Sequence, residues 1–346
     1  MRGFGFREHG DAGRLEFVDV IEPTPGPGEV RLRVRAAGFN RLDRFVLAGI
    51  PGVPIERPHV LGSDAAGTID AVGAGVEGRS LGDRVLVNPG LWDGTCDACL
   101  AHHESLCRAF RIVGEHTQGA AAPYLVVPAR NVHALPERLG FEEAAAAPLV
   151  FQTAWRALLT VGELEAGETV AIIGAGGGAA TAAVQIARLR GARTVVATRS
   201  EEKAERARAL GADETVVFSD EHPLDRRLWE WSGKRGVDLI FDSVGAPTLP
   251  RSVRAIARGG RVVVIGATAG PVVEIDVRTL FWRQGSIRGS TMADAAEFEA
   301  VLRELDRGTL KPVVDRVFDL EEAHEAFRRF ESPDVVGKVV LRLPAT

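Results

Sequence analysis

A run of glycines is the part of the chain best suited to chemistry. Its members are Gly174, Gly176, Gly177 and Gly178. They follow the apolar segment Val170–Ile173, which predicts a buried strand. Helix-forming residues come next, at 179–190, and a second strand is predicted at Thr194–Ala197. In such a βαβ unit the helix N-terminus holds a pyrophosphate and the glycines let the backbone approach it. The run therefore predicts a dinucleotide site; the alternative is a turn that serves only tight helix–strand packing.

The residues after the second strand indicate which dinucleotide binds. An NAD site usually places Asp or Glu there to hold the ribose 2′-hydroxyl. This chain instead has Thr198, Arg199, Ser200 and, one helical turn later, Lys203. The guanidinium of Arg199 can pair bidentately with a 2′-phosphate. We therefore expect NADPH in preference to NADH; the alternative makes Arg199 and Lys203 a solvated helix start.

The cysteines and the overall charge limit the compartment and the partners. Two of the three cysteines are spaced as Cys96-x2-Cys99, which suits a metal or thiol site in a reducing compartment. The N-terminus lacks the apolar core of a signal peptide, and the long uncharged stretches are poor membrane spans. A net charge of −5 argues against a nucleic-acid partner. We expect a cytoplasmic protein with a small-molecule substrate and no membrane or nucleic-acid partner.

The elements that must position these residues fall into two regions. In the first 140 residues, strands are predicted at Leu15–Val20, Val30–Ala37, Ala66–Val72, Arg84–Val87 and Tyr124–Pro128. Short strands without long helices favour a β-barrel-like domain. The next region alternates helices with strands, which are predicted, beyond the two beside the glycines, at Glu214–Val217, Leu239–Asp242, Arg261–Ile265 and Ser286–Ser290. This alternation predicts an α/β doubly wound sheet of six parallel strands.

Two further turns follow strands of this predicted sheet. They contain Asp242, Val244 and Gly245, and Gly266 and Ala267. Because ligands bind at the carboxyl ends of parallel strands, we expect these residues beside the nicotinamide half of the cofactor. The alternative is turn chemistry alone. The last 55 residues mix helices and strands and are expected to return to the first region.

Several segments, taken together, resemble the medium-chain dehydrogenase/reductase superfamily. In chain order around the glycine run they are AAGFNRLDRFVLAG, HVLGSDAAGTIDAVGAGV, GDRV, APLVFQTAW and GKVVL. The chain is most similar to quinone-oxidoreductase-like members with a zinc lobe, often labelled zinc-type alcohol dehydrogenases. The resemblance implies a GroES-like substrate domain at 1–145 and 291–346 and a Rossmann NADP(H)-binding domain at 146–290, with the active site between them. It also implies a homodimer or homotetramer joined through the sheet edge near 283–290.

The chain departs from the zinc alcohol dehydrogenases at the catalytic zinc. That family uses a Cys, a Gly-His-Glu motif and a further Cys or carboxylate. Here those positions read Asn40, Gly62-Ser63-Asp64 and Leu149. Because Asn and Ser are feeble zinc ligands, only Asp64 remains a credible donor, and we expect no catalytic zinc. The alternative is an alcohol dehydrogenase with an unusual metal set, such as Asp64 with His59.

The resemblance also implies a second, structural zinc site. The family's lobe reads Cys-x2-Cys-x2-Cys-x7-Cys, and this chain reproduces the spacing with Asp93, Cys96, Cys99 and Cys107. Three thiolates and one carboxylate can hold Zn²⁺, and His102 or His103 could replace Asp93. The alternative is a vestigial lobe with ordinary thiols.

These features together predict an NADPH-dependent reductase. Without a catalytic metal nothing stabilises an alkoxide, but hydride can still pass to a quinone or an α,β-unsaturated carbonyl, whose oxygen then needs a hydrogen-bond donor. By resemblance the Asn40 amide is that donor, Thr153 lies beside the nicotinamide carboxamide, and Ser63 and Asp43 line the cleft. The alternatives are that Asn40 is only a turn residue and that Asp43 makes only a structural hydrogen bond. A cofactor-binding protein with little turnover is the other possible function.

Overall fold

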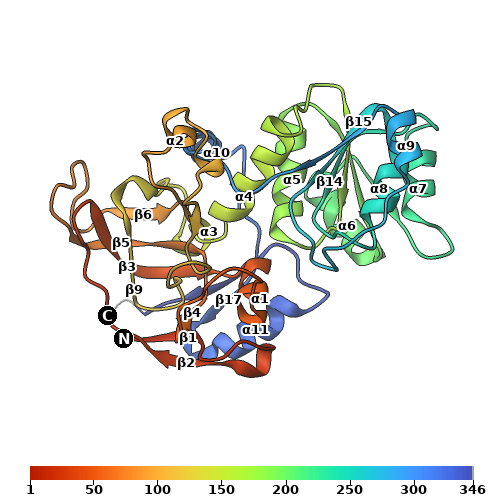
Figure 1. The fold of residues 1–346 in the computed structure, drawn as a ribbon. Coiled ribbons are helices and arrows are strands. Elements are labelled where there is room, and N and C mark those ends of the chain that lie inside the picture. Colours follow the sequence, from red (N-terminus) through yellow and green to blue (C-terminus); the bar gives the residue numbers. More distant parts are fainter. Residues whose placement is uncertain (345–346) are drawn as a thin grey trace. The chain divides into compact units, whose positions relative to one another are not determined.

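The computed structural model describes residues 1–344, and the chain divides into two units. The first comprises Met1–Leu149 and Asp294–Thr346, and the second comprises Val150–Ala293. Figure 1 shows the elements of each unit, which are described separately below.

The second unit contains the predicted doubly wound sheet. Within Val150–Ala293, all of which is described, six parallel strands lie in the order β13-β12-β11-β14-β15-β16. The strands are β11 Thr169–Ile173, β12 Arg193–Thr198, β13 Glu214–Val217, β14 Val237–Asp242, β15 Ile256–Val264 and β16 Ser286–Gly289. Every residue of β11 is buried, as a central strand between two helical layers requires. The strand order reverses between β11 and β14, so the glycine turn after β11 lies where such sheets bind ligands.

The helices of this unit agree less completely with the sequence prediction. They are α5 Gly178–Leu189, α6 Glu201–Ala209, α7 Leu224–Trp231, α8 Leu249–Ala255 and α9 Val277–Trp282, while α4, Pro148–Trp155, joins the two units. α7 and α9 were not predicted. β15 begins five residues before the predicted strand, because Ile256 already pairs with Val237 of β14.

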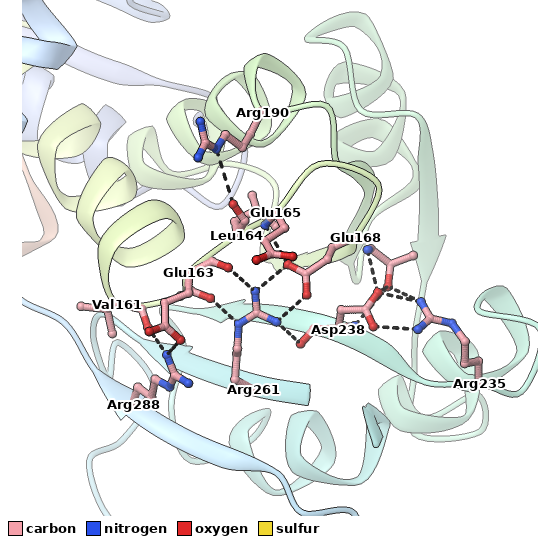
Figure 2. Close-up of polar contacts among 12 residues, drawn as sticks. Val161, Glu163, Leu164, Glu165, Glu168, Arg190, Arg235, Asp238, Arg261 and Arg288 are labelled. Atoms are coloured by element: carbon pink, nitrogen blue, oxygen red, sulfur yellow. Dashed lines mark hydrogen bonds and ion pairs between the residues drawn. The ribbon is translucent and has the colours of Figure 1, made fainter. Parts of the chain in front are cut away.

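A buried arginine ties the loop before β11 to the sheet. Figure 2 shows the guanidinium of Arg261, from β15, between that loop and β14. Its two Nη atoms donate to the two Glu168 carboxylate oxygens at 2.6 and 2.8 Å, and also to the carbonyls of Glu163 (3.0 Å) and Asp238 (3.2 Å). Nε donates to the Gly162 carbonyl. All five N–H groups of Arg261 are thus used, which fixes the loop that leads into β11.

Replacing Arg261 with alanine is expected to destabilise this unit by about 3 kcal/mol, because the change strands buried carbonyls and removes a buried ion pair. The matched control is Arg254→Ala. Arg254 pairs with Asp225 at 2.7 Å, but its side chain is 42% exposed, so its loss should cost less than about 1 kcal/mol. Urea unfolding midpoints of the two variants check this. An equal loss in both would show that the Arg261 contacts contribute no more than a surface pair.

The first unit is β-rich, as predicted. Within residues 1–149 and 294–344, the largest sheet follows the order β10-β6-β5-β3-β18-β17, with β9 also paired to β3. Its strands are β3 Glu29–Gly38, β5 Asp64–Val72, β6 Arg84–Val87, β9 Tyr124–Pro128, β10 Val132–Ala134, β17 Val314–Asp319 and β18 Lys338–Arg342. A smaller sheet, β2-β1-β4, contains Leu15–Asp19, Arg2–Phe6 and His59–Val60, and a two-stranded one pairs β7 Gly90–Leu91 with β8 Arg111–Ile112.

The C-terminal segment packs into this unit. β18 pairs antiparallel with β3, so residues 338–342 lie in the same sheet as the N-terminal strands. The helices of the unit are α1 Arg41–Ala48, α2 Asp97–Leu100, α3 Phe141–Ala144, α10 Ala295–Arg307 and α11 Ala323–Glu331. α11 buries Phe327 and Phe330, which contact Phe39 just after β3. The fold class predicted from the sequence, a GroES-like β domain with a Rossmann sheet, is confirmed. In residues 1–344, every helix is too short or too polar to cross a membrane.

Candidate functional site

The glycine turn after β11 has the shape that a pyrophosphate site needs. Gly174 has a φ of +90°, which L side chains rarely adopt, and a Cβ built on it or on Gly177 would meet nothing within 4 Å. Gly177 is the N-cap of α5, and no side chain caps the helix there. The positive end of this 12-residue helix therefore has no capping side chain. This turn can hold an anionic group on backbone donors alone.

The residues after β12 form a short polar turn. Thr198 is buried, and its hydroxyl accepts a hydrogen bond from the Ser200 N–H at 3.3 Å. Ser200 caps α6 by accepting from the backbone N–H of Lys203 at 3.4 Å. Arg199 has a side chain that is 66% exposed and only a distant contact, 3.8 Å, with the exposed Asp220. The Arg199 guanidinium thus lies at a turn, is mostly exposed, and within residues 1–344 makes only this weak ion pair with another side chain.

The turn after β14 is built around Asp242. Its buried carboxylate accepts from the backbone N–H groups of Val244 (2.9 Å) and Gly245 (3.2 Å) and from the hydroxyls of Thr248 and Ser252. These hydrogen bonds hold the carboxylate and shape the turn. Gly266 and Ala267 follow β15 and lie against this turn; the Cα of Ala267 is 3.0 Å from a Cβ built on Gly245.

A compact polar cluster lies in the core of the first unit. Asn40, Asp64 and Lys338 are 4%, 0% and 3% exposed. The Lys338 ammonium contacts Asn40 Oδ1 at 2.5 Å and Asp64 Oδ2 at 2.8 Å. Asn40 Nδ2 donates to the same Asp64 oxygen at 3.0 Å, and Asp64 Oδ1 accepts from the Leu149 N–H at 2.8 Å.

The sheet register explains how residues far apart in the sequence meet in this cluster. Gly38, at the end of β3, pairs with Asp64 of β5 on one side and with Val340 of β18 on the other. Asn40 follows two residues later as the N-cap of α1. A side chain at Gly38 would collide with the Ala145 carbonyl, at 2.2 Å, so only glycine permits this approach.

Asp43 fixes the backbone on both sides of the cluster. Its carboxylate accepts from the N–H of Asn40 at 2.6 Å and from the N–H of Gly62 at 2.7 Å. Burial raises the pKa of Asp43 from 3.8 to about 6, although these two backbone donors and the nearby Lys338 charge favour the ionised form. Ser63 is fully buried and its hydroxyl has no hydrogen-bond partner among the described residues. Thr153 belongs to the second unit, where it is buried in α4.

The predicted zinc ligands gather in a lobe of the first unit. Asp93, Cys96, Cys99 and Cys107 place their ligand atoms within 4.8 Å of one another, the one such group of three or more His, Cys, Asp or Glu in residues 1–344. The sulfurs of Cys96 and Cys99 are 3.5 Å apart, close to the ~3.8 Å that a tetrahedral zinc site imposes. The N–H groups of Thr95 and Cys96 bond Asp93 Oδ1 and hold the pKa of this carboxyl well below its usual range. These donors favour the ionised form of Asp93, which is the form that binds a metal.

Reciprocal hydrogen bonds join the lobe to the start of α10. Asp294, the N-cap of α10, accepts from the Ser105 N–H at 2.8 Å, and Glu104 accepts from the Ala295 N–H at 3.2 Å. Figure 1 shows α2 of the lobe beside α10. Both carboxylates are buried. The shape of the lobe is thus coupled to the segment where the chain re-enters the first unit.

Comparison with known proteins identifies the family. The family models that match are the alcohol dehydrogenase GroES-like domain, over residues 26–137, and the zinc-binding dehydrogenase, over residues 178–307. The acryloyl-coenzyme A reductase of Metallosphaera sedula is 32% identical over 94% of this chain and 96% of its own length. The chain belongs to the medium-chain dehydrogenase/reductase superfamily. It is an oxidoreductase of that superfamily.

Other members of the superfamily carry different activities in their names. Human quinone oxidoreductase is 29% identical over 94% of this chain and 92% of its own length. A crystal structure of an NAD-dependent alcohol dehydrogenase superposes with a TM-score of 0.93 at 44% identity, covering 99% of this chain and 100% of that one. Membership in the superfamily therefore fixes the fold and the reaction class, and the substrate must be argued from the site.

Sequence reasoning missed Lys338. It lies in the GKVVL segment, which is one of the segments that resemble the superfamily. Lysine is rarely fully buried, so the residue type alone gives no signal of a place in a buried polar cluster. The pairing of β18 with β3, far away in the sequence, is what brings it to Asn40 and Asp64.

Proposed function

We propose that the protein transfers hydride from NADPH to a quinone or an α,β-unsaturated carbonyl compound without a catalytic metal. One observation carries the proposal. Of the positions that hold catalytic zinc in related dehydrogenases, only Asp64 offers a good ligand, and its carboxylate already pairs with the buried ammonium of Lys338 at 2.8 Å. A zinc ion there would meet a like charge, together with the weak ligands Asn40 and Ser63. The donor set does not fit a catalytic zinc.

The histidine suggested for an unusual metal set already has a hydrogen-bond partner. His59, suggested as a partner of Asp64 in an unusual metal set, is buried with its Nε2 3.0 Å from the Gly114 carbonyl. None of the described contacts favours a metal ion between Asp64 and His59. An alcohol dehydrogenase is therefore kept only as one outcome of the substrate test described below.

The bound nicotinamide supplies the hydride, and the protein must stabilise the charge that develops on the acceptor's carbonyl oxygen. Asn40 has two amide hydrogens. One is used by Asp64, and the other has only a long contact, 3.5 Å, with the Gly38 carbonyl. This second N–H is suited to donate to the oxygen as it becomes negative. A preorganised donor of this kind contributes about 10²–10³ in rate in other enzymes.

NADPH is the cofactor that the turn residues favour. The open glycine turn and the uncapped α5 provide the pyrophosphate site, and Arg199 provides a cation where a 2′-phosphate would lie. A carboxylate that would hold the NAD ribose is lacking from residues 198–200. Gly245, Gly266 and Ala267 are proposed to border the nicotinamide, and Thr153 to contact its carboxamide.

The lobe ligands fit a structural zinc. Asp93, Cys96, Cys99 and Cys107 would hold the ion, since three sulfurs and one oxygen complete a tetrahedron and leave no open position. We also propose a homodimer or homotetramer joined through β16, which is one of the two edge strands of the described sheet.

Substrate profiling of enzyme with measured metal content tests the function. NADPH oxidation is followed with quinones and enones, and NADP⁺ reduction with primary and secondary alcohols. We expect turnover with the first group and none with ethanol. Zinc-dependent ethanol oxidation would establish the alcohol dehydrogenase alternative, and tight NADPH binding without any turnover would establish a binding protein.

A further inference from the structure

Lys338 is a buried cation whose partners are both functional candidates. Its ammonium bridges Asn40 Oδ1 and Asp64 Oδ2, and all three residues are at most 4% exposed. A buried lysine is costly unless it is paired and hydrogen-bonded. Packing alone does not require a charged pair here, because an apolar pair of similar size is often equally stable.

The contacts of Lys338 settle the orientation of the Asn40 amide. An ammonium group only donates hydrogen bonds, so the atom that faces Lys338 must be the amide oxygen. The amide nitrogen then faces Asp64 Oδ2, which as a carboxylate oxygen only accepts. Both neighbours thus select one orientation. If the amide were flipped, its nitrogen would face the ammonium and its oxygen would face the carboxylate.

The backbone of Asn40 is held as firmly as its side chain. Its N–H donates to Asp43, which also binds Gly62, and its carbonyl accepts from the Asp43 N–H at 2.9 Å in the first turn of α1. The remaining freedom of this residue is the rotation of its amide, and Lys338 with Asp64 removes it.

We propose that Lys338 is a positioning residue that, held by Asp64, fixes the Asn40 amide with one N–H directed to the acceptor oxygen. This inference rests on the proposed function. Lys338 acts through Asn40 and not by contact with the acceptor. The Lys338–Asp64 pair is therefore a device for catalysis as well as for folding.

The first variant is Lys338→Met, which keeps the length of the side chain and removes its donors. Because it leaves the Asp64 carboxylate buried without its cation, this variant can fail to fold. The paired variant Lys338→Met/Asp64→Asn removes both charges and keeps an oxygen for the Leu149 N–H. We expect its kcat to fall at least about tenfold, with the KM for NADPH unchanged and a larger isotope effect from NADPH deuterated at the transferred position.

The matched control is Arg31→Met/Asp70→Asn. This pair joins the same two strands, β3 and β5, with two 3.0 Å contacts and side chains 18% exposed, but it lies at the opposite end of β3 from Gly38. Its neutralisation should leave kcat and the isotope effect unchanged. Lys338→Arg keeps donors for both acceptors and should recover part of the lost kcat.

A double-mutant cycle with Asn40→Ala separates positioning from a general structural effect. If Lys338 acts through Asn40, the paired variant should cost little further kcat once the amide is gone. Additive losses in the cycle, or a paired variant within twofold of the parent kcat, would overturn the inference. Wild-type enzyme that reduces no quinone or enone would instead contradict the proposed function, so the two failures are distinguishable.

Discussion

Exchanging Arg199 for aspartate is expected to reverse the cofactor preference from NADPH to NADH. The substitution removes a guanidinium that can make two charge-assisted hydrogen bonds to the 2′-phosphate, and it adds a carboxylate that repels the phosphate and can bind a ribose hydroxyl. Because each such bond contributes about 1.5–3 kcal/mol, the NADPH-to-NADH ratio of kcat/KM should change by at least about 100-fold. Steady-state kinetics with a single acceptor and both cofactors measures this ratio.

The control for this prediction is Arg206→Asp, which makes the same charge change later in α6. Arg206 pairs with Glu202 at 2.5 Å on the helix surface, and it is not among the turn residues. This variant should keep the parent preference. If Arg199→Asp also keeps it, the assignment of Arg199 to the 2′-phosphate is wrong.

Loss of one lobe thiolate is expected to have the largest effect on stability. Cys99 is buried among the four ligand atoms, and Cys99→Ser leaves a neutral, weakly binding hydroxyl in a tetrahedral site. We expect bound zinc to fall from about one per chain to near zero, with a lower thermal midpoint, since metal binding and folding of the lobe are coupled. Atomic absorption on protein purified without chelator, together with thermal unfolding, measures both quantities.

Variants of the fourth ligand refine this prediction. Asp93→Asn keeps an oxygen for the Thr95 and Cys96 N–H groups but removes the charge, so it should weaken zinc binding while preserving the turn. His102→Ala and His103→Ala should retain zinc, because their rings are not in the ligand cluster. Zinc-free wild-type protein, or loss of zinc in a histidine variant, would contradict the ligand set.

Local patterns in the sequence predicted the sheet of the second unit well. The apolar run of β11, the glycines and the first turn of α6 lie within about 35 consecutive residues, so local propensity and spacing fix them. The short elements of the first unit were harder to predict from the sequence. β1 was not predicted because its five residues include two glycines and charged residues follow directly. Its two phenylalanines are nevertheless fully buried, and β1 pairs with β2 and β4. α1 was not predicted, although Asp43 lies three residues after Asn40 and accepts from its N–H, as the acidic residue of a capping box does.

Side-chain partners across the sheet could not be predicted from spacing. Asp242, the last residue of β14, is predicted to lie beside the cofactor, and its carboxylate also accepts from the hydroxyls of Thr248, the N-cap of α8, and Ser252 within α8. Lys338 meets Asn40 across a separation of 298 residues. Such contacts depend on the register of β18 against β3, and a one-residue shift would turn Lys338 to the other face.

The most direct test of the account follows the label from NADPH carrying deuterium at the transferred position. The enzyme is incubated with an α,β-unsaturated ketone, the product is analysed by NMR, and zinc is counted in the same preparation. We predict deuterium at the β-carbon of the product with no more than one zinc per chain. Two zinc ions per chain, with deuterium delivered only to the carbonyl carbon in a zinc-dependent reaction, would contradict hydride transfer without a catalytic metal.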